Sequence, residues 1–196
     1  MSEKRQRLID TAIRLFAQHG FHNTGIDWIA EEAKVSKKTM YHHFRSKEEL
    51  ILAALRHHDG LFRNHFMKSV NSLGNTPYER LLAMFDVAHD WFSDQAFYGC
   101  MFINAVGEYA NPNTPIRDVC RDFKKLMRGF MASLVTEAGI SPVEQTTAAL
   151  AILLEGSIVS AQVSNDPQSA RTAKAAAKVL IDNALKNTHK NHPVVA

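Results

Sequence analysis

The sequence has few cysteines, and they form no pattern that would hold a metal or a disulfide framework. Only two occur among 196 residues, Cys100 and Cys120, and neither belongs to a Cys-x-x-Cys or Cys/His cluster. Long apolar runs are also lacking. The longest, from Ala148 to Leu154, ends at Glu155 and is far shorter than the roughly 20 residues that cross a bilayer. The first residues are amphipathic, unlike a signal peptide. We therefore expect a soluble cytoplasmic protein without a cofactor.

Enzyme motifs are missing too. The chain has no G-x-S-x-G, no P-loop and no glycine-rich dinucleotide fingerprint. Ten histidines raise the alternative of an all-helical metal enzyme, and Asp86, His89 and Asp90 could share a helix face. A di-metal bundle needs a second carboxylate-x-x-His pair, and none is evident. We expect no metal site and no enzymatic activity.

Period-two alternation is absent, whereas apolar residues recur at helical spacing along the chain, which predicts an all-α fold. No proline precedes Pro77. Four prolines follow a capping residue, a pattern typical of a helix start. These starts are Thr76-Pro77, Thr114-Pro115, Ser141-Pro142 and Asp166-Pro167, and the first and third also have the sequence of a capping box. We predict nine helices, near residues 3–19, 25–33, 37–43, 47–71, 77–95, 99–110, 115–138, 142–164 and 167–187.

The net charge of +3 is unevenly distributed. Residues 1–56 contain ten Lys/Arg and seven Asp/Glu, whereas residues 57–196 contain thirteen of each, so the whole excess lies in the first quarter of the chain. This asymmetry is compatible with a polyanionic partner, although a solvated basic face would give the same count.

The helices predicted at 25–33 and 37–43 have the form of a helix-turn-helix. Thr24 is placed to cap the first and Ser36 the second. If Met40 and Phe44 point inward, Lys38 and His42 point outward, with Thr39 and Tyr41 at the edges of that face. Such a helix can enter the major groove of DNA. The capping box of Ser46-Lys47-Glu48-Glu49 follows, and a helix N-terminus with a lysine is suited to hold a phosphate.

These residues resemble the DNA-binding signature of the TetR/AcrR family of transcriptional regulators. The resemblance covers roughly residues 5–55 and rests on Gly20-Phe21, Thr24, Ile29-Ala30, Ala33, the run from Val35 to Phe44 and the run from Ser46 to Leu50. It implies phosphate contacts by Thr24, Tyr41 and Lys47, and base or groove contacts by Lys37, Lys38, Thr39 and His42. Two residues depart from the family pattern: Lys34 stands in a turn where glycine is frequent, and the bulky Trp28 replaces a smaller or polar residue.

The resemblance also implies a domain organisation. Residues 1–46 would form the helix-turn-helix domain, and residues 47–187 a helical domain that binds an effector and forms a homodimer. Residues 188–196 lack helical periodicity and contain Pro193, so we expect a disordered tail there. The helix at 142–164 is apolar on two sides, and the last helix repeats small residues that permit close helix packing. Two core helices of a monomer would show the same pattern. The expected dimer residues are Ile152, Gly156, Val159, Val163, Ala173, Ala177, Leu180 and Ala184.

The middle helices concentrate aromatic side chains with a few polar residues, as a ligand cavity or a plain core would. The candidate effector-pocket residues are Phe85, His89, Trp91, Phe92, Cys100, Phe102, Asn104, Glu108, Phe123, Met127 and Phe130. Cys100 could equally be a small buried hydrophobe or a redox switch. We expect a repressor that binds a quasi-palindromic DNA operator as a dimer and is released by a small apolar or amphipathic effector. The alternative is an architectural DNA-binding protein of the same fold without an effector.

Overall fold

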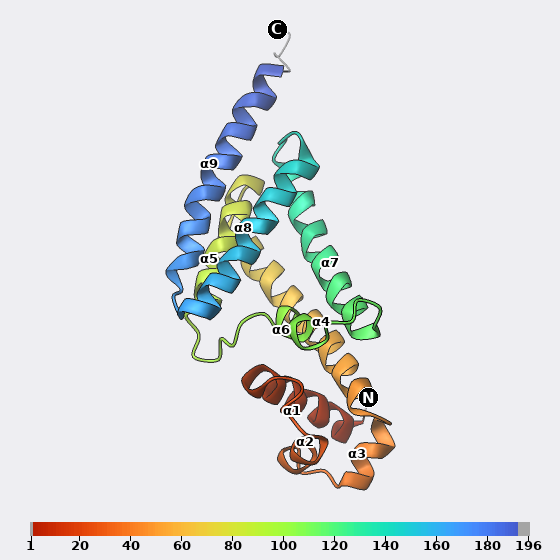
Figure 1. The fold of residues 1–196 in the computed structure, drawn as a ribbon. Coiled ribbons are helices and arrows are strands. Elements are labelled where there is room, and N and C mark those ends of the chain that lie inside the picture. Colours follow the sequence, from red (N-terminus) through yellow and green to blue (C-terminus); the bar gives the residue numbers. More distant parts are fainter. Residues whose placement is uncertain (1, 192–196) are drawn as a thin grey trace. The chain divides into compact units, whose positions relative to one another are not determined.

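The computed structural model describes residues 2–191, and these residues form nine α-helices and no strand (Figure 1). The predicted all-α fold is confirmed. The helices are α1 (Glu3–His19), α2 (Ile26–Glu32), α3 (Lys37–His43), α4 (Lys47–Leu73), α5 (Pro77–Phe92), α6 (Met101–Glu108), α7 (Pro115–Glu137), α8 (Val143–Ser164) and α9 (Gln168–Asn191).

The chain forms two compact units, and the boundaries along the sequence fall within α4, just before α6 and within α7. Among the described residues, the first unit contains residues 2–62 and 100–124, and the second contains residues 63–99 and 125–191. In the first unit, α1 packs against α2 and α3 and forms with them a three-helix head. The apolar stripe of α1 is its buried face, and solvent reaches almost none of Leu8, Ile9, Ala12, Leu15 and Phe16.

Most of the predicted helix starts are confirmed by hydrogen bonds. Thr76 forms a complete capping box with Glu79, and the Ser36 hydroxyl accepts from the backbone N–H of Thr39. The prediction at Ser141 is wrong. Pro142, rather than Ser141, is the N-cap of α8, and no side chain caps that helix. A proline at the N-cap offers no side-chain acceptor, so the spacing to Glu144 alone does not produce a capping box.

The predicted cap of α2 is also wrong, because Gly25 is its N-cap residue. The Thr24 side chain is completely buried, and its hydroxyl donates to the Gly20 carbonyl at 2.7 Å. The turn after α2 has a lysine where glycine is frequent in the TetR family. Lys34 has a left-handed φ of +53°, and the N–H groups of Lys34 and Val35 donate to the carbonyls of Glu31 and Ala30 at the end of the helix.

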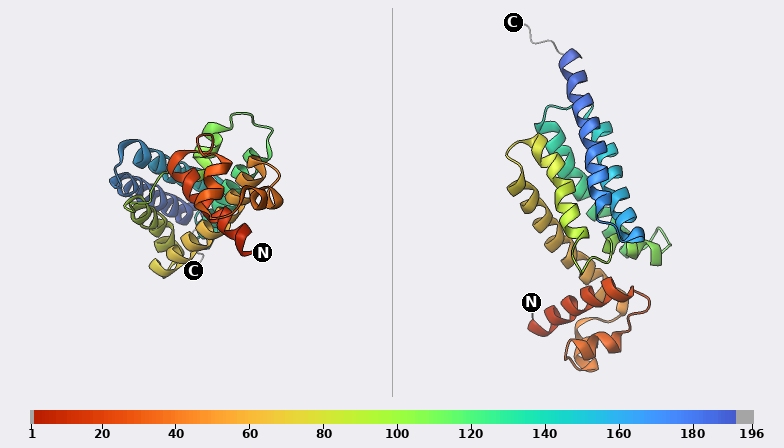
Figure 2. Two further views of the ribbon diagram at one scale, coloured as in Figure 1. Left: turned by 90° about the horizontal axis from the view of Figure 1, so that it is seen from below. Right: turned by 90° about the vertical axis from the view of Figure 1, so that its left-hand side faces the viewer.

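In the second unit, α5, α8 and α9 lie side by side, as both views of the ribbon show (Figures 1 and 2). The α5–α9 contact has polar links at two levels: the Tyr78 hydroxyl donates to Asp182 at 2.8 Å, and Lys174 pairs with Asp86 at 2.6 Å. The inward stripe of α9 consists of Ala170, Ala173, Ala177 and Ile181. The three alanines allow α5 and α8 to pack closely against α9.

Helix α9 continues to Asn191, four residues beyond its predicted end at 187. The Thr188 hydroxyl accepts from the backbone N–H of Ser141, which ties this last turn to the start of α8. Part of the segment predicted to be a disordered tail, residues 192–196, lies outside the described residues. By length and composition α8 could cross a membrane, but a core helix of a soluble protein passes the same test.

Candidate DNA-binding surface and regulatory sites

Two buried side chains hold helix α3 against the head, and most of its other side chains are exposed. Met40 and Phe44 are buried in the head, as the helical spacing predicted. Lys38, Tyr41 and His42 are exposed, Tyr41 with 47% of its surface accessible. Thr39 is partly exposed, and its hydroxyl lies 2.9 Å from that of Ser36. The outward face therefore offers cationic, imidazole and hydroxyl groups that can reach base edges and phosphates.

Lys37 is also exposed but is engaged with α2. Its ammonium group lies 2.8 Å from the Asp27 carboxylate, and this hydrogen bond raises the lysine pKa. The two side chains are well solvated, so the pair stabilises the head little. Lys37 can exchange Asp27 for a DNA group at small cost.

The N-terminus of α4 lies beside the α1–α2 turn. The Ser46 hydroxyl accepts from the Glu49 N–H at 3.2 Å, and the Glu49 carboxylate accepts from the Arg45 N–H at 2.8 Å. The Lys47 ammonium donates to the His22 carbonyl at 3.1 Å. Partial burial lowers the pKa of Lys47, and the nearby Glu108 carboxylate acts in the opposite direction.

Two predicted site residues have contacts that the sequence did not suggest. The Thr24 hydroxyl is used inside the head, and its predicted phosphate contact remains a prediction. Glu108, assigned from the sequence to the effector pocket, has its carboxylate on the α1–α2 turn, where it accepts from the N–H groups of Phe21 at 2.7 Å and His22 at 2.6 Å. A sequence separation of more than 85 residues hides this contact from any local pattern.

The other candidate effector residues are divided between the two units. Cys100, Phe102, Asn104 and Phe123 belong to the first unit, and Phe85, His89, Trp91, Phe92, Met127 and Phe130 belong to the second. Their grouping in one effector pocket stays a prediction.

The first unit contains a cluster of aromatic rings. Phe102 stacks on Phe123 with 3.8 Å between ring centroids, and the His58 ring lies 5.8 Å from both Phe62 and Phe102. His58 was not identified from the sequence as part of a site. Cys120 is buried in the same unit, and burial raises the pKa of its thiol to about 11, so it is protonated and unreactive at neutral pH.

The second unit has its own ring cluster, in which Phe97 contacts Trp91 at 5.2 Å and Phe92 at 5.0 Å. His89 on the same helix has a buried Nε2 atom without a hydrogen-bond partner, while its Nδ1 lies 3.5 Å from Asp90. A buried polar atom without a partner is unusual in a folded protein, and a bound polar group is one explanation. Within residues 2–191, no three His, Cys, Asp or Glu side chains are grouped so that they could hold a metal ion.

Helix α8 carries an exposed apolar face. Ile152, Val159 and Val163 share it with Gly156, and the accessible fractions of Ile152 and Val163 are 69% and 81%. The α9 side differs from the prediction. Ala173 and Ala177 are buried within their own chain because they belong to the inward stripe, whereas Val179 is a large apolar residue of α9 that is exposed. The other dimer residues stay a prediction.

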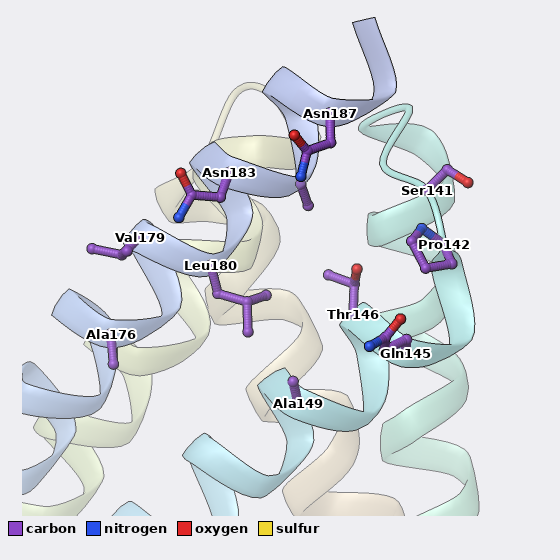
Figure 3. Close-up of a pocket in the computed structure, with 11 residues that line it drawn as sticks. Ser141, Pro142, Gln145, Thr146, Ala149, Ala176, Val179, Leu180, Asn183 and Asn187 are labelled. Carbon is purple, nitrogen blue, oxygen red and sulfur yellow. The ribbon is translucent and has the colours of Figure 1, made fainter. Parts of the chain in front are cut away.

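A hollow of about 700 Å³ lies between the first half of α8 and the second half of α9 (Figure 3). Gln145 and Ala149 of α8 line it on one side, and Val179, Leu180 and Asn183 of α9 line it on the other. Leu180 and Ala184, both predicted dimer residues, are among its walls.

Comparison with known proteins gives two family matches. Residues 8–54 match the bacterial regulatory proteins of the tetR family, and residues 77–177 match the tetracyclin repressor-like C-terminal domain. An HTH-type transcriptional regulator of Lactococcus lactis, encoded in the lacX 3' region, is 25% identical over 83% of this chain and 85% of its own length. The regulator YerO of Bacillus subtilis is 42% identical over 42% of this chain, but the match spans only 28% of YerO.

Solved structures agree with these matches. SCO4454, a TetR-family transcriptional regulator from Streptomyces coelicolor, is 29% identical, superimposes with a TM-score of 0.86, and the alignment covers 93% of this chain and 90% of SCO4454. The two family matches together cover most of the chain, including the helix-turn-helix described above. The chain therefore belongs to the TetR family of helix-turn-helix transcriptional regulators, a family of DNA-binding proteins rather than enzymes.

Proposed function

We propose that this chain is a cytoplasmic repressor that binds a quasi-palindromic operator as a homodimer and leaves it when a small effector binds. The observation that carries the proposal is the outward face of α3, where Lys38, Tyr41 and His42 are exposed on a helix whose opposite side is locked into the head by Met40. Cationic and hydrogen-bonding side chains on a short, rigidly packed helix are what readout in the major groove requires.

The exposed face of α8 supports the homodimer. Ile152, Val159 and Val163 would cost free energy if they stayed in water, and they recur at helical spacing on one side. A twofold axis through this face would bring α8 and α9 of each copy into a four-helix contact, with Gly156 allowing close approach. Such a dimer would present two α3 helices to half-sites about 34–36 Å apart.

The aromatic clusters support an amphipathic effector. Rings such as Phe92 and Trp91 provide apolar contact, and the unpartnered Nε2 of His89 provides a hydrogen-bonding group for a polar atom of the ligand. In this mechanism the effector shifts α4, changes the spacing of the two α3 helices and so weakens the operator complex. A titrated effector that leaves DNA affinity unchanged would contradict it.

The test of the DNA-binding residues uses duplexes selected by the wild-type protein from a random pool. We expect Lys38→Ala and His42→Ala to reduce the preference for selected over random duplexes by about 1–3 kcal/mol, because they remove base contacts. Lys47→Ala should instead weaken binding to both kinds of duplex and reduce the slope of log K against log salt by about 0.9, because it removes one phosphate contact. Fluorescence anisotropy at several salt concentrations measures all three effects.

The exposed Lys186 of α9, outside the head, supplies the matched control, since Lys186→Ala removes the same charge. Equal losses on both kinds of duplex for Lys38→Ala, His42→Ala and Lys47→Ala would contradict the assigned roles.

Chromatin immunoprecipitation with sequencing tests the wider proposal. A few operators support a specific regulator, and hundreds of dispersed sites support an architectural protein. Transcript levels after deletion of the gene for this protein then separate repression from activation. Activation is the role named for FasR of Mycolicibacterium smegmatis, which is 46% identical to this chain over 56 residues.

A further inference from the structure

The last residue of α6 is bound to the turn between α1 and α2. The Glu108 carboxylate accepts from two consecutive backbone N–H groups, those of Phe21 at 2.7 Å and His22 at 2.6 Å, and one of its oxygens lies 3.1 Å from the His22 imidazole. Hydrogen bonds from N–H groups to an ionised carboxylate are among the stronger ones in proteins. A residue outside the three-helix head therefore satisfies two backbone N–H groups of a turn inside that head.

The backbone of the turn is shaped for this contact. Gly20 has a φ of +83°, and a Cβ atom at that position would lie 2.9 Å from Oε1 of Glu108. Any other residue would be strained by its backbone conformation and would press on the carboxylate. The ring of Tyr109, the next residue after Glu108, packs against Phe21 and His22 with centroid distances of 6.2 Å and 4.8 Å.

The same turn supports Lys47. The His22 carbonyl accepts from the Lys47 ammonium at 3.1 Å, while the His22 N–H donates to Glu108. One peptide segment thus connects the carboxylate of α6 with the lysine at the start of α4. If Glu108 released the turn, the carbonyl that orients Lys47 would move with it.

We propose that Glu108 is a positioning residue for DNA binding, which acts by holding the turn at Phe21 and His22 and through that turn the ammonium group of Lys47. This inference rests on the proposed phosphate contact of Lys47. It also makes α6, whose first turn carries Phe102 of the aromatic cluster, a direct mechanical connection to the helix-turn-helix.

Electrostatics alone predicts the opposite effect of Glu108 removal on DNA affinity. Glu108 is an acid close to Lys47, so its removal would raise the local positive potential and strengthen DNA binding if charge alone mattered. Positioning predicts weaker binding. The direction of the change therefore distinguishes the two effects without knowledge of the effector.

The test is a double-mutant cycle on the full chain with duplexes selected by the wild-type protein. We expect Glu108→Ala to weaken binding about tenfold, Glu108→Gln to weaken it less because it keeps one acceptor oxygen, and Lys47→Ala, Glu108→Ala together to be about as weak as Lys47→Ala alone. Glu137→Ala, an exposed acid at the end of α7, is the charge-matched control and should leave affinity unchanged or slightly raised. Far-UV circular dichroism verifies folding, and Glu108→Gln carries the test if Glu108→Ala unfolds.

Several results would overturn the inference. If the folded Glu108 variants bind DNA as tightly as the wild type or more tightly, Glu108 acts only through its charge. A full tenfold loss from Glu108→Ala in the Lys47→Ala background would show that Glu108 does not act through Lys47. If Lys47→Ala by itself has no effect, the phosphate contact in the proposed function is wrong, and the route through Lys47 fails with it. If Lys47→Ala weakens DNA binding and Glu108→Ala does not, only the positioning role of Glu108 is refuted.

Discussion

His58 makes the stability of this protein depend on pH in a way that can be calculated. Its ring lies among Phe62 and Phe102, and burial lowers its pKa from 6.5 to about 4, with Asp59 opposing the shift and His57 adding to it. Between these two pH values, the His58 imidazole is therefore protonated in the unfolded chain and neutral in the folded chain. Stability contributed by the neutral imidazole is complete above pH 6.5 and is lost as the pH falls towards 4.

The magnitude follows from the two pKa values. At pH 5.0 the unfolded state gains about 2 kcal/mol relative to the folded state, whereas at pH 7.5 the gain is below about 0.1 kcal/mol. His58→Gln removes the titrating group. Between pH 7.5 and pH 5.0, the free energy of unfolding of the variant should therefore fall by about 2 kcal/mol less than that of the wild type. For a chain of this size, the difference corresponds to about 4–8 °C in melting temperature.

Urea unfolding at pH 7.5 and pH 5.0, at one protein concentration, measures the effect. Carboxylates and other histidines titrate in both proteins and cancel in the comparison. His65→Gln replaces an exposed histidine of the same helix and should behave like the wild type. If wild type and His58→Gln lose the same free energy, His58 is not buried as a neutral ring, and the reasoning is refuted.

Three further predictions concern the dimer, the head and α5. If the proposed homodimer forms through the exposed face of α8, Val163→Asp buries one charge from each copy at the contact and should give monomers in sedimentation experiments. A dimeric Val163→Asp variant would contradict an interface on this face of α8. Thr24→Val should lower the free energy of unfolding by about 1–2 kcal/mol because it removes the buried bond to Gly20, and Thr24→Ser should retain most of it; equal stabilities would show that this hydroxyl matters little to the fold. Thr76→Ala should cost about 1 kcal/mol by breaking the capping box of α5, as thermal melts would show, and an unchanged melting temperature would contradict that role.

The elements that were predicted correctly are those decided by local chemistry. Ser36 caps α3 and Thr76 caps α5 because a hydroxyl reaches a backbone N–H three residues away, a contact that depends only on neighbouring residues. Lys34 stands where glycine is frequent in the family and has the left-handed conformation that glycine adopts easily. The errors arose where two local signals competed, as at Ser141-Pro142, where proline took the cap position itself.

The sequence by itself determined that this protein is all helical and that α3 turns Met40 and Phe44 inward, because helical spacing and capping act over a few residues. The helix-turn-helix regulator family was indicated by the resemblance of residues 5–55 to the TetR signature. Only the tertiary structure decided that Ala173 and Ala177 face the inside of their own unit, and that Glu108 closes the α1–α2 turn. These contacts join residues tens of positions apart. A periodic pattern shows which side of a helix is apolar or charged, but the packing of whole helices selects the partner that side meets.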